Sequence, residues 1–158
     1  ASHRAGTYIR PDTRGSHPVR RHGTMLLELV LTLALLAIVA AVTVPSIVAT
    51  TDRLGAIGAR HDVVLALWAA RHAAITRGAN ASLVVDAPAG RVRVVCAGDT
   101  VFARDVGATR RTTIAVTRDS ITYAPTGLGY GAANTRIIVA RGRWADTITT
   151  SRLGRVSF

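Results

Sequence analysis

Cysteine occurs once in this sequence, at position 96, and lysine does not occur at all. A single thiol cannot close an internal disulfide, so the fold has to be stable without a covalent crosslink. Cys96 ends the valine-rich segment 92–96, which favours a small buried side chain over a reactive thiol. Because lysine is absent, all 20 basic residues are arginines, and with nine acids the formal net charge is +11.

Aromatic residues are also scarce, at 4% of the chain. The core must therefore consist mainly of valine, isoleucine, leucine and alanine, with Trp68, Phe102, Tyr123 and Trp144 as aromatic anchors. The part from residue 50 to 158, about 109 residues, is long enough for one small domain with its own core.

Residue patterns that would support catalysis or metal binding are missing. There is no His-Glu-x-x-His, paired-cysteine or Gly-x-Ser-x-Gly element. His61 and His72 are separated by about 16 Å on the helix proposed below, too far to share a metal ion. The glycines of 127–131 lack the spacing of a dinucleotide fingerprint and predict a flexible hairpin or loop. We expect no enzyme activity, no metal site and no cofactor.

One long segment has no charge. Leu29 to Ala49 carry no ionisable side chain, and Glu28 lies at the N-terminal edge of this run. Roughly 20 apolar residues in a helix span the ~30 Å hydrocarbon core of a bilayer. We therefore predict a single membrane-spanning helix. A carboxylate beside it is costly, so Glu28 needs either access to water or a cationic partner.

The residues before this run are basic and rich in turn formers. Residues 1–23 contain five arginines and one acid, and they lack apolar periodicity. Positive charge next to a membrane helix is retained on the cytoplasmic side, which predicts a cytoplasmic N-terminus and an exported C-terminal domain. If a peptidase cut after Gly23, the new α-amine of Thr24 would lie one helical turn from Glu28 and could neutralise it.

Residues 20–28, Arg-Arg-His-Gly-Thr-Met-Leu-Leu-Glu, followed by the apolar run, resemble the class III signal of type IV prepilins and type II secretion pseudopilins. The resemblance implies cleavage after Gly23 by a prepilin peptidase, which methylates the new N-terminus, and docking into a helical filament guided by Glu28. Pro45 stands where this family commonly has a helix-kinking proline. Thr24 departs from the usual phenylalanine or methionine.

Helical spacing continues beyond Pro45. Apolar or histidine residues recur every three or four positions, at Leu54, Ile57, His61, Val64, Trp68, His72 and Ile75. We expect this stripe to pack on a sheet. The helix is predicted to bend at Pro45, to be irregular near Gly55 and Gly58, and to end near Arg77, before Gly78.

From residue 81 onward the pattern predicts strands and no further helix. The expected strands are Ala81–Asp86, Arg91–Cys96, Thr100–Arg104, Thr112–Arg118, Ser120–Tyr123, Thr135–Arg141, Thr147–Thr150 and Arg155–Phe158. The first two are joined by a four-residue turn, 87–90. The predicted fold class is α+β, with a long N-terminal membrane-spanning helix that packs its C-terminal half on antiparallel β-sheets.

Two short motifs narrow the resemblance. Ala-Ile-Thr-Arg-Gly at 74–78 and Gly-Arg-Val-Ser at 154–157 resemble the GspH/FimT-like branch of minor pilins and pseudopilins. The expected organisation is a basic prepilin leader at 1–23, an apolar assembly helix at 24–49 and an exported pilin-like domain at 50–158. The subunit would then reside in the inner membrane before it enters a filament with other pilins or pseudopilins.

Two alternatives stay open at this point. Some minor pilins of this branch serve DNA uptake, and Arg152 and Arg155 are then the candidate phosphate contacts, with the arginines at 110, 111, 141 and 143 as further anion contacts. The other alternative is an ordinary secretory signal followed by a soluble domain, with cleavage near Val42. An ordinary apolar region has 7–15 residues and no acid, so the run after Glu28 fits it less well.

Overall fold

The computed structural model of the chain describes residues 22–130 and 135–158. Most of the predicted leader, residues 1–21, and the loop residues 131–134 lie outside the described residues. The chain divides into two compact units, Ala1–Ala41 and Val42–Phe158. Each unit is described by itself below.

Helix α1 spans His22–Arg77 and contains Pro45. The chain stays helical through Gly55 and Gly58, so the irregularity predicted there is wrong. The end near Arg77 is confirmed, because Gly78 takes a positive φ of 60° that terminates the helix. The bend at Pro45 stays a prediction.

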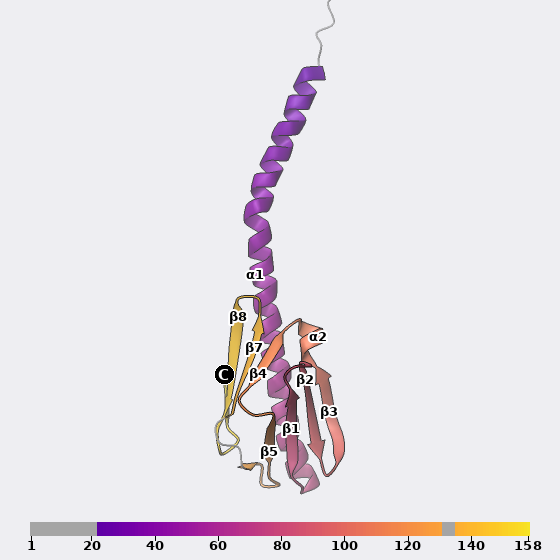
Figure 1. Ribbon diagram of the computed structural model, residues 1–158, viewed down its shortest axis with the longest axis vertical. Coiled ribbons are helices and arrows are strands. Elements are labelled where there is room, and N and C mark those ends of the chain that lie inside the picture. Colours follow the sequence, from indigo (N-terminus) through magenta and orange to yellow (C-terminus); the bar gives the residue numbers. More distant parts are fainter. Residues whose placement is uncertain (1–21, 131–134) are drawn as a thin grey trace, which may run out of the picture. The chain divides into compact units, whose positions relative to one another are not determined.

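Strands follow α1 in two antiparallel sheets (Figure 1). The first sheet has the order β3-β2-β1-β5-β6 and the second the order β4-β7-β8-β9. The strands are β1 Ala81–Asp86, β2 Arg91–Cys96, β3 Asp99–Asp105, β4 Thr113–Val116, β5 Ser120–Tyr123, β6 Gly129–Tyr130, β7 Thr135–Arg141, β8 Trp144–Thr150 and β9 Val156–Ser157. The predicted α+β class, a long helix followed by antiparallel sheets, is confirmed.

A second helix, α2 Val106–Arg110, interrupts the strands, so the expectation of no further helix is wrong. It is a single turn, too short to produce an apolar period in the sequence. The Asp105 carboxylate caps it by accepting a hydrogen bond of 2.8 Å from the Ala108 amide. The helix ends at Arg110 and is followed by Arg111, which has a left-handed φ of 53°.

The face of α1 that packs on the sheets differs from the predicted stripe. Leu54 is 62% exposed and Trp68 64% exposed, whereas Ala59 and Ala70 are completely buried. The buried face consists mainly of alanine, with Val63 and Leu67. Small side chains let the helix axis approach the sheets closely, and the strands supply the large core residues Leu83, Val94, Ile121, Ile137 and Ile148.

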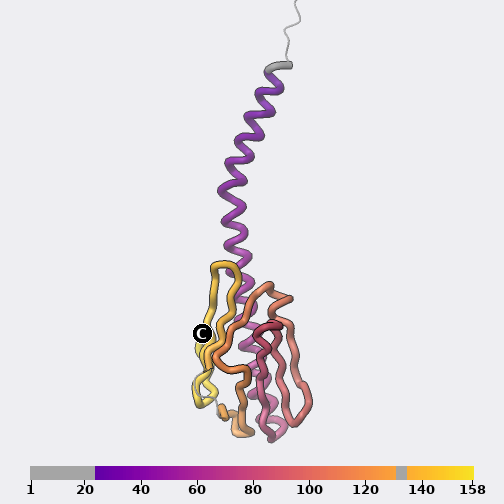
Figure 2. The backbone as a smooth tube through the Cα atoms, viewed as in Figure 1, coloured from indigo at the N-terminus to yellow at the C-terminus, as the bar shows by residue number. Residues whose placement is uncertain are grey.

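Both sheets lie along the C-terminal half of α1, as the backbone path shows (Figure 2). Of the four predicted aromatic anchors, Tyr123 is buried and Phe102 packs at the edge of the core. Trp68 and Trp144 are not core residues, since they are 64% and 37% exposed. Cys96 is buried, as its apolar surroundings predict.

Candidate functional site

The N-terminal part of α1 carries the predicted assembly residues. From Thr24 to Val48 all side chains are exposed, and they include Glu28 and Pro45. Among the described residues one helix, Thr24–Arg77, is long and apolar enough to cross a membrane, with a mean hydropathy of 2.7 in its apolar window. Its apolar side chains are therefore exposed in the described chain.

Gly23, Thr24 and Glu28 lie on continuous helix. Residues four apart in a helix lie on the same face, separated by about 6 Å along the axis. The structure therefore places the Thr24 backbone nitrogen and the Glu28 carboxylate on one side of the helix terminus. An α-amine created at Thr24 would lie about one helical turn from the Glu28 carboxylate of the same chain.

Two arginines from the strand region cross α1 where the helix has a glycine. The Arg141 Nε donates a hydrogen bond of 3.0 Å to the Asp52 Oδ1, and its Nη1 donates one of 2.8 Å to the carbonyl of Arg110. A Cβ at Gly55 would lie 2.5 Å from that Nη1. Gly55 thus leaves the space through which the guanidinium reaches Asp52.

The second contact between an arginine and α1 is at Asp62, whose side chain is only 2% exposed. The Arg110 Nε lies 2.8 Å from one carboxylate oxygen, and the Arg104 Nη1 lies 3.0 Å from the other. Gly58 lies beneath the Arg110 guanidinium, where a Cβ would come within 3.0 Å of it. The hydrogen bond from Arg110 to Asp62 raises the pKa of that arginine. The buried charge is thus paired on both oxygens.

These contacts change the assignment of the anion-binding candidates. Arg110 and Arg141 are bound to helix carboxylates, so their guanidinium groups hold the second unit together. The sequence contains a signal for this arrangement, which the periodicity argument missed. Each crossing has a glycine and an aspartate three or four positions apart on α1, Asp52 with Gly55 and Gly58 with Asp62.

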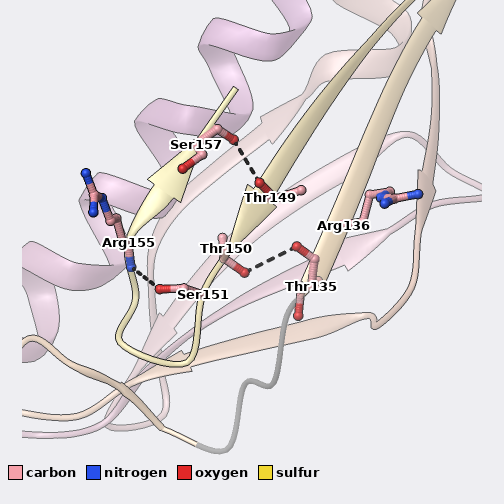
Figure 3. Close-up of a pocket in the computed structure, with 7 residues that line it drawn as sticks. All are labelled: Thr135, Arg136, Thr149, Thr150, Ser151, Arg155 and Ser157. Atoms are coloured by element: carbon pink, nitrogen blue, oxygen red, sulfur yellow. Dashed lines mark hydrogen bonds between the residues drawn. The ribbon is translucent and has the colours of Figure 1, made fainter.

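The two arginines proposed for DNA contact lie on the turn between β8 and β9. Arg155 lines a cavity of about 350 Å³ between β7, β8 and β9, and Arg152 does not. Arg136 also lines the cavity, but its side chain and that of Arg155 lie on opposite sides of the drawn residues (Figure 3). Hydrogen bonds of 3.2 Å from the Arg155 amide to Ser151 and 3.3 Å from Thr149 to the carbonyl of Ser157 hold the strand ends together.

The described residues contain no group of three or more histidine, cysteine, aspartate or glutamate side chains that could hold a metal ion. His61 and His72 are both exposed on α1. The pKa of Tyr123 is raised chiefly because its phenol is buried, and the charge of Arg71 acts in the opposite direction. None of these groups forms a reactive cluster in the described part of the chain.

Comparison with known proteins identifies the fold. No family model matches the sequence, and no curated protein matches it. Two crystal structures of the type IV minor pilin FimU from Pseudomonas aeruginosa are similar to this structure. One has a TM-score of 0.58 and 14% identity, and it covers 69% of this chain and 91% of FimU. The other has a TM-score of 0.53 and 12% identity, and it covers 63% and 89%. The long N-terminal helix followed by antiparallel sheets is therefore the type IV pilin α+β fold.

Proposed function

We propose that this chain is a minor pilin or pseudopilin, a structural subunit that assembles through α1 into a type IV pilus or a type II secretion pseudopilus. One observation carries the proposal: the pilin fold has an exposed apolar helix of membrane length with Glu28 at its head. Such a helix needs either lipid or other apolar helices around it. A filament of parallel subunits provides the second environment.

The assembly step depends on a new charge at the N-terminus. Cleavage by a prepilin peptidase after Gly23 gives Thr24 a protonated α-amine, which the peptidase then methylates. Before extraction the helix is anchored once in the inner membrane, with the N-terminus cytoplasmic and the domain outside. A charged carboxylate within an apolar bilayer costs about 2.5–3.5 kcal/mol at the helix centre, and less near its ends. The amine of a neighbouring subunit removes this cost when it pairs with Glu28.

The test replaces the carboxylate. Glu28→Ala should leave membrane insertion intact and reduce co-assembly with partner pilins by tenfold or more. Thr32→Ala is the matched control, because the Thr32 hydroxyl donates to the Leu29 carbonyl of its own helix at 2.9 Å and needs no neighbour. Filament incorporation is measured by quantitative immunoblotting of sheared filaments. Normal incorporation of the alanine variant would count against the pairing.

Processing is tested separately. N-terminal sequencing of the mature protein should begin at Thr24, and Gly23→Glu should block cleavage by obstructing the peptidase subsite. A start near Val42 would instead support the ordinary secretory signal and a released soluble domain. An unchanged mature mass in the Gly23→Glu variant would refute cleavage at this glycine.

DNA binding by a competence pilus is the second candidate. It is favoured by the exposed positions of Arg152 and Arg155 around the β8–β9 turn, at one end of the second sheet. Replacing both with glutamine should lower the affinity for double-stranded DNA and flatten its salt dependence by roughly one unit per lost phosphate contact. The candidate fails if the unmodified protein shows no binding at low salt.

A further inference from the structure

The turn between β7 and β8 is fixed against α1. Besides the ion pair between Arg141 and Asp52, the Arg53 guanidinium lies over the Trp144 ring, 5.3 Å from its centroid. Gly142, at the turn, has a φ of +55°, and a Cβ there would collide with the Asp52 carboxylate. The ion pair, the arginine–tryptophan contact and the close approach of Gly142 to Asp52 therefore hold this turn at one level of the helix, as its position beside α1 in Figure 1 illustrates.

That level is where the uncharged run ends. Asp52 and Arg53 are the first charged residues after Glu28, and Ala49, the last residue of the run, lies only about 6 Å from Arg53 along the helix axis. A run of this length fills the ~30 Å hydrocarbon core. If α1 spans a bilayer through this run, Arg53 and the β7–β8 turn lie at the depth of the lipid headgroups.

The chemistry of the turn suits that depth. A groove of about 940 Å³ beside α1 is lined by apolar side chains, among them Val48 and Leu54, together with Arg53, Arg143 and Trp144. Asp52 also lines it, and the carboxylate of Asp52 is paired with Arg141. Trp144 is 37% exposed and Leu54 62% exposed. Tryptophan is enriched at membrane–water interfaces, and arginine pairs with lipid phosphates. Apolar surface, an aromatic ring and two cations thus face the same layer.

We propose that the β7–β8 turn is a membrane-interface contact. Trp144 inserts at the headgroup level of an anionic bilayer, and Arg53 and Arg143 bind the lipid phosphates, so that the domain rests on the membrane until the subunit is extracted. The inference rests on the proposed function, because it needs α1 to be anchored in the membrane. It adds a lipid-binding surface to the globular unit, which has to be released when the filament forms.

Two tryptophans, Trp68 and Trp144, make the test specific. Trp68 lies about 22 Å beyond Arg53 along α1, far outside the headgroup layer. The full chain is reconstituted in vesicles of phosphatidylcholine and phosphatidylglycerol with bromine on the upper acyl carbons, as Trp68→Phe and as Trp144→Phe. Fluorescence of Trp144 should be quenched at least twofold more than that of Trp68. Equal quenching of the two would overturn the proposal.

The arginine contribution has its own variant. Arg143→Glu, introduced into the protein that retains only Trp144, should reduce the quenching at least twofold. Arg152→Glu is the matched control, since it makes the same charge change beyond the other end of β8 and should leave quenching unchanged. Quenching that is insensitive to Arg143→Glu would overturn phosphate binding by this turn.

Flotation separates this inference from the proposed function. Protein that floats with vesicles after a carbonate wash is anchored through α1. If the chain floats but Trp144 is not quenched, only the membrane-interface contact is refuted. If the chain does not float, the membrane anchor itself is refuted, and the contact with it.

Discussion

Gly55→Ala should destabilise this protein, although the same substitution stabilises most helices. In a helix interior alanine is more stable than glycine by about 1 kcal/mol. At this position, however, a Cβ would lie 2.5 Å from the Arg141 Nη1 and 2.6 Å from its Cδ. The guanidinium has to move, and it then loses the contacts that attach β7 to α1.

The size of the loss follows from two hydrogen bonds. Arg141 donates to the Asp52 carboxylate at 3.0 Å and to the Arg110 carbonyl at 2.8 Å. Hydrogen bonds to charged groups contribute about 1.5–3 kcal/mol, and the lower end applies because the two side chains are 22% and 21% exposed. Losing both costs about 3 kcal/mol. After the helix gain, Gly55→Ala should destabilise the second unit by about 2 kcal/mol.

Thermal unfolding of the full chain in mild detergent, followed by near-ultraviolet circular dichroism, measures the effect. A change of 1 kcal/mol shifts Tm by roughly 4–8 °C in a domain of this size. In an Arg141→Ala background the guanidinium is absent, so the same substitution should stabilise by about 1 kcal/mol. Thr51→Ala, on the exposed side of α1, is a control for a substitution that touches only the helix itself, since the Thr51 hydroxyl donates to the Val48 carbonyl at 2.8 Å. The same sign of change in both backgrounds would refute the steric argument.

Three further predictions follow from the second unit. Asp62→Asn removes the charge from a side chain that is 2% exposed, so the free energy of unfolding in urea should fall by about 2–3 kcal/mol. A loss below about 0.5 kcal/mol would contradict the pairing of Asp62 with the two arginines. Gly90→Ala places a Cβ 2.8 Å from the Gly107 Cα, at a residue whose φ is +65°. The free energy of unfolding should therefore fall by at least about 2 kcal/mol in the same assay. An unchanged urea midpoint would contradict the close backbone approach. The pKa of Asp105 lies below its ordinary value of 3.8, because its carboxylate accepts a hydrogen bond from the Ala108 amide and a second one from Arg91. The ionised carboxylate contributes to stability above pH 3.8, and this contribution disappears as the pH falls through the lowered pKa of the folded state. Asp105→Ala should therefore make Tm less sensitive to acid. An identical acid dependence of Tm would refute the role of Asp105 as a helix cap.

Local sequence patterns predicted most of the elements. β1 and β2 have the predicted bounds, because alternating β-branched residues and a turn ending in glycine act within a few positions. The end of α1 is also set locally, by Gly78. By contrast, β8 begins at Trp144, three residues earlier than predicted, because pairing with β7 extends it through Ala145 and Asp146, which have low strand propensity.

The candidate site likewise has one part that local sequence predicts and one part that it does not. Glu28, its spacing from Gly23 and the uncharged run are neighbours in the chain, so the sequence alone indicates an anchor and a cleavage point, which stay predictions until processing is measured. The contact between Arg141 and Asp52 joins residues 89 positions apart. No local pattern contains it, and only the packing of the second sheet against α1 brings the two together.

By itself, the sequence determined a long helix with an apolar N-terminal run, its termination at Gly78 and the β-rich remainder, since hydrophobic period and glycine conformation are local properties. The tertiary structure alone decided which face of α1 is buried. The periodic stripe favoured the largest side chains, such as Trp68, but the sheets already supply the bulk of the core. Close packing at that density then selects the alanine face of the helix and leaves Trp68 in solvent.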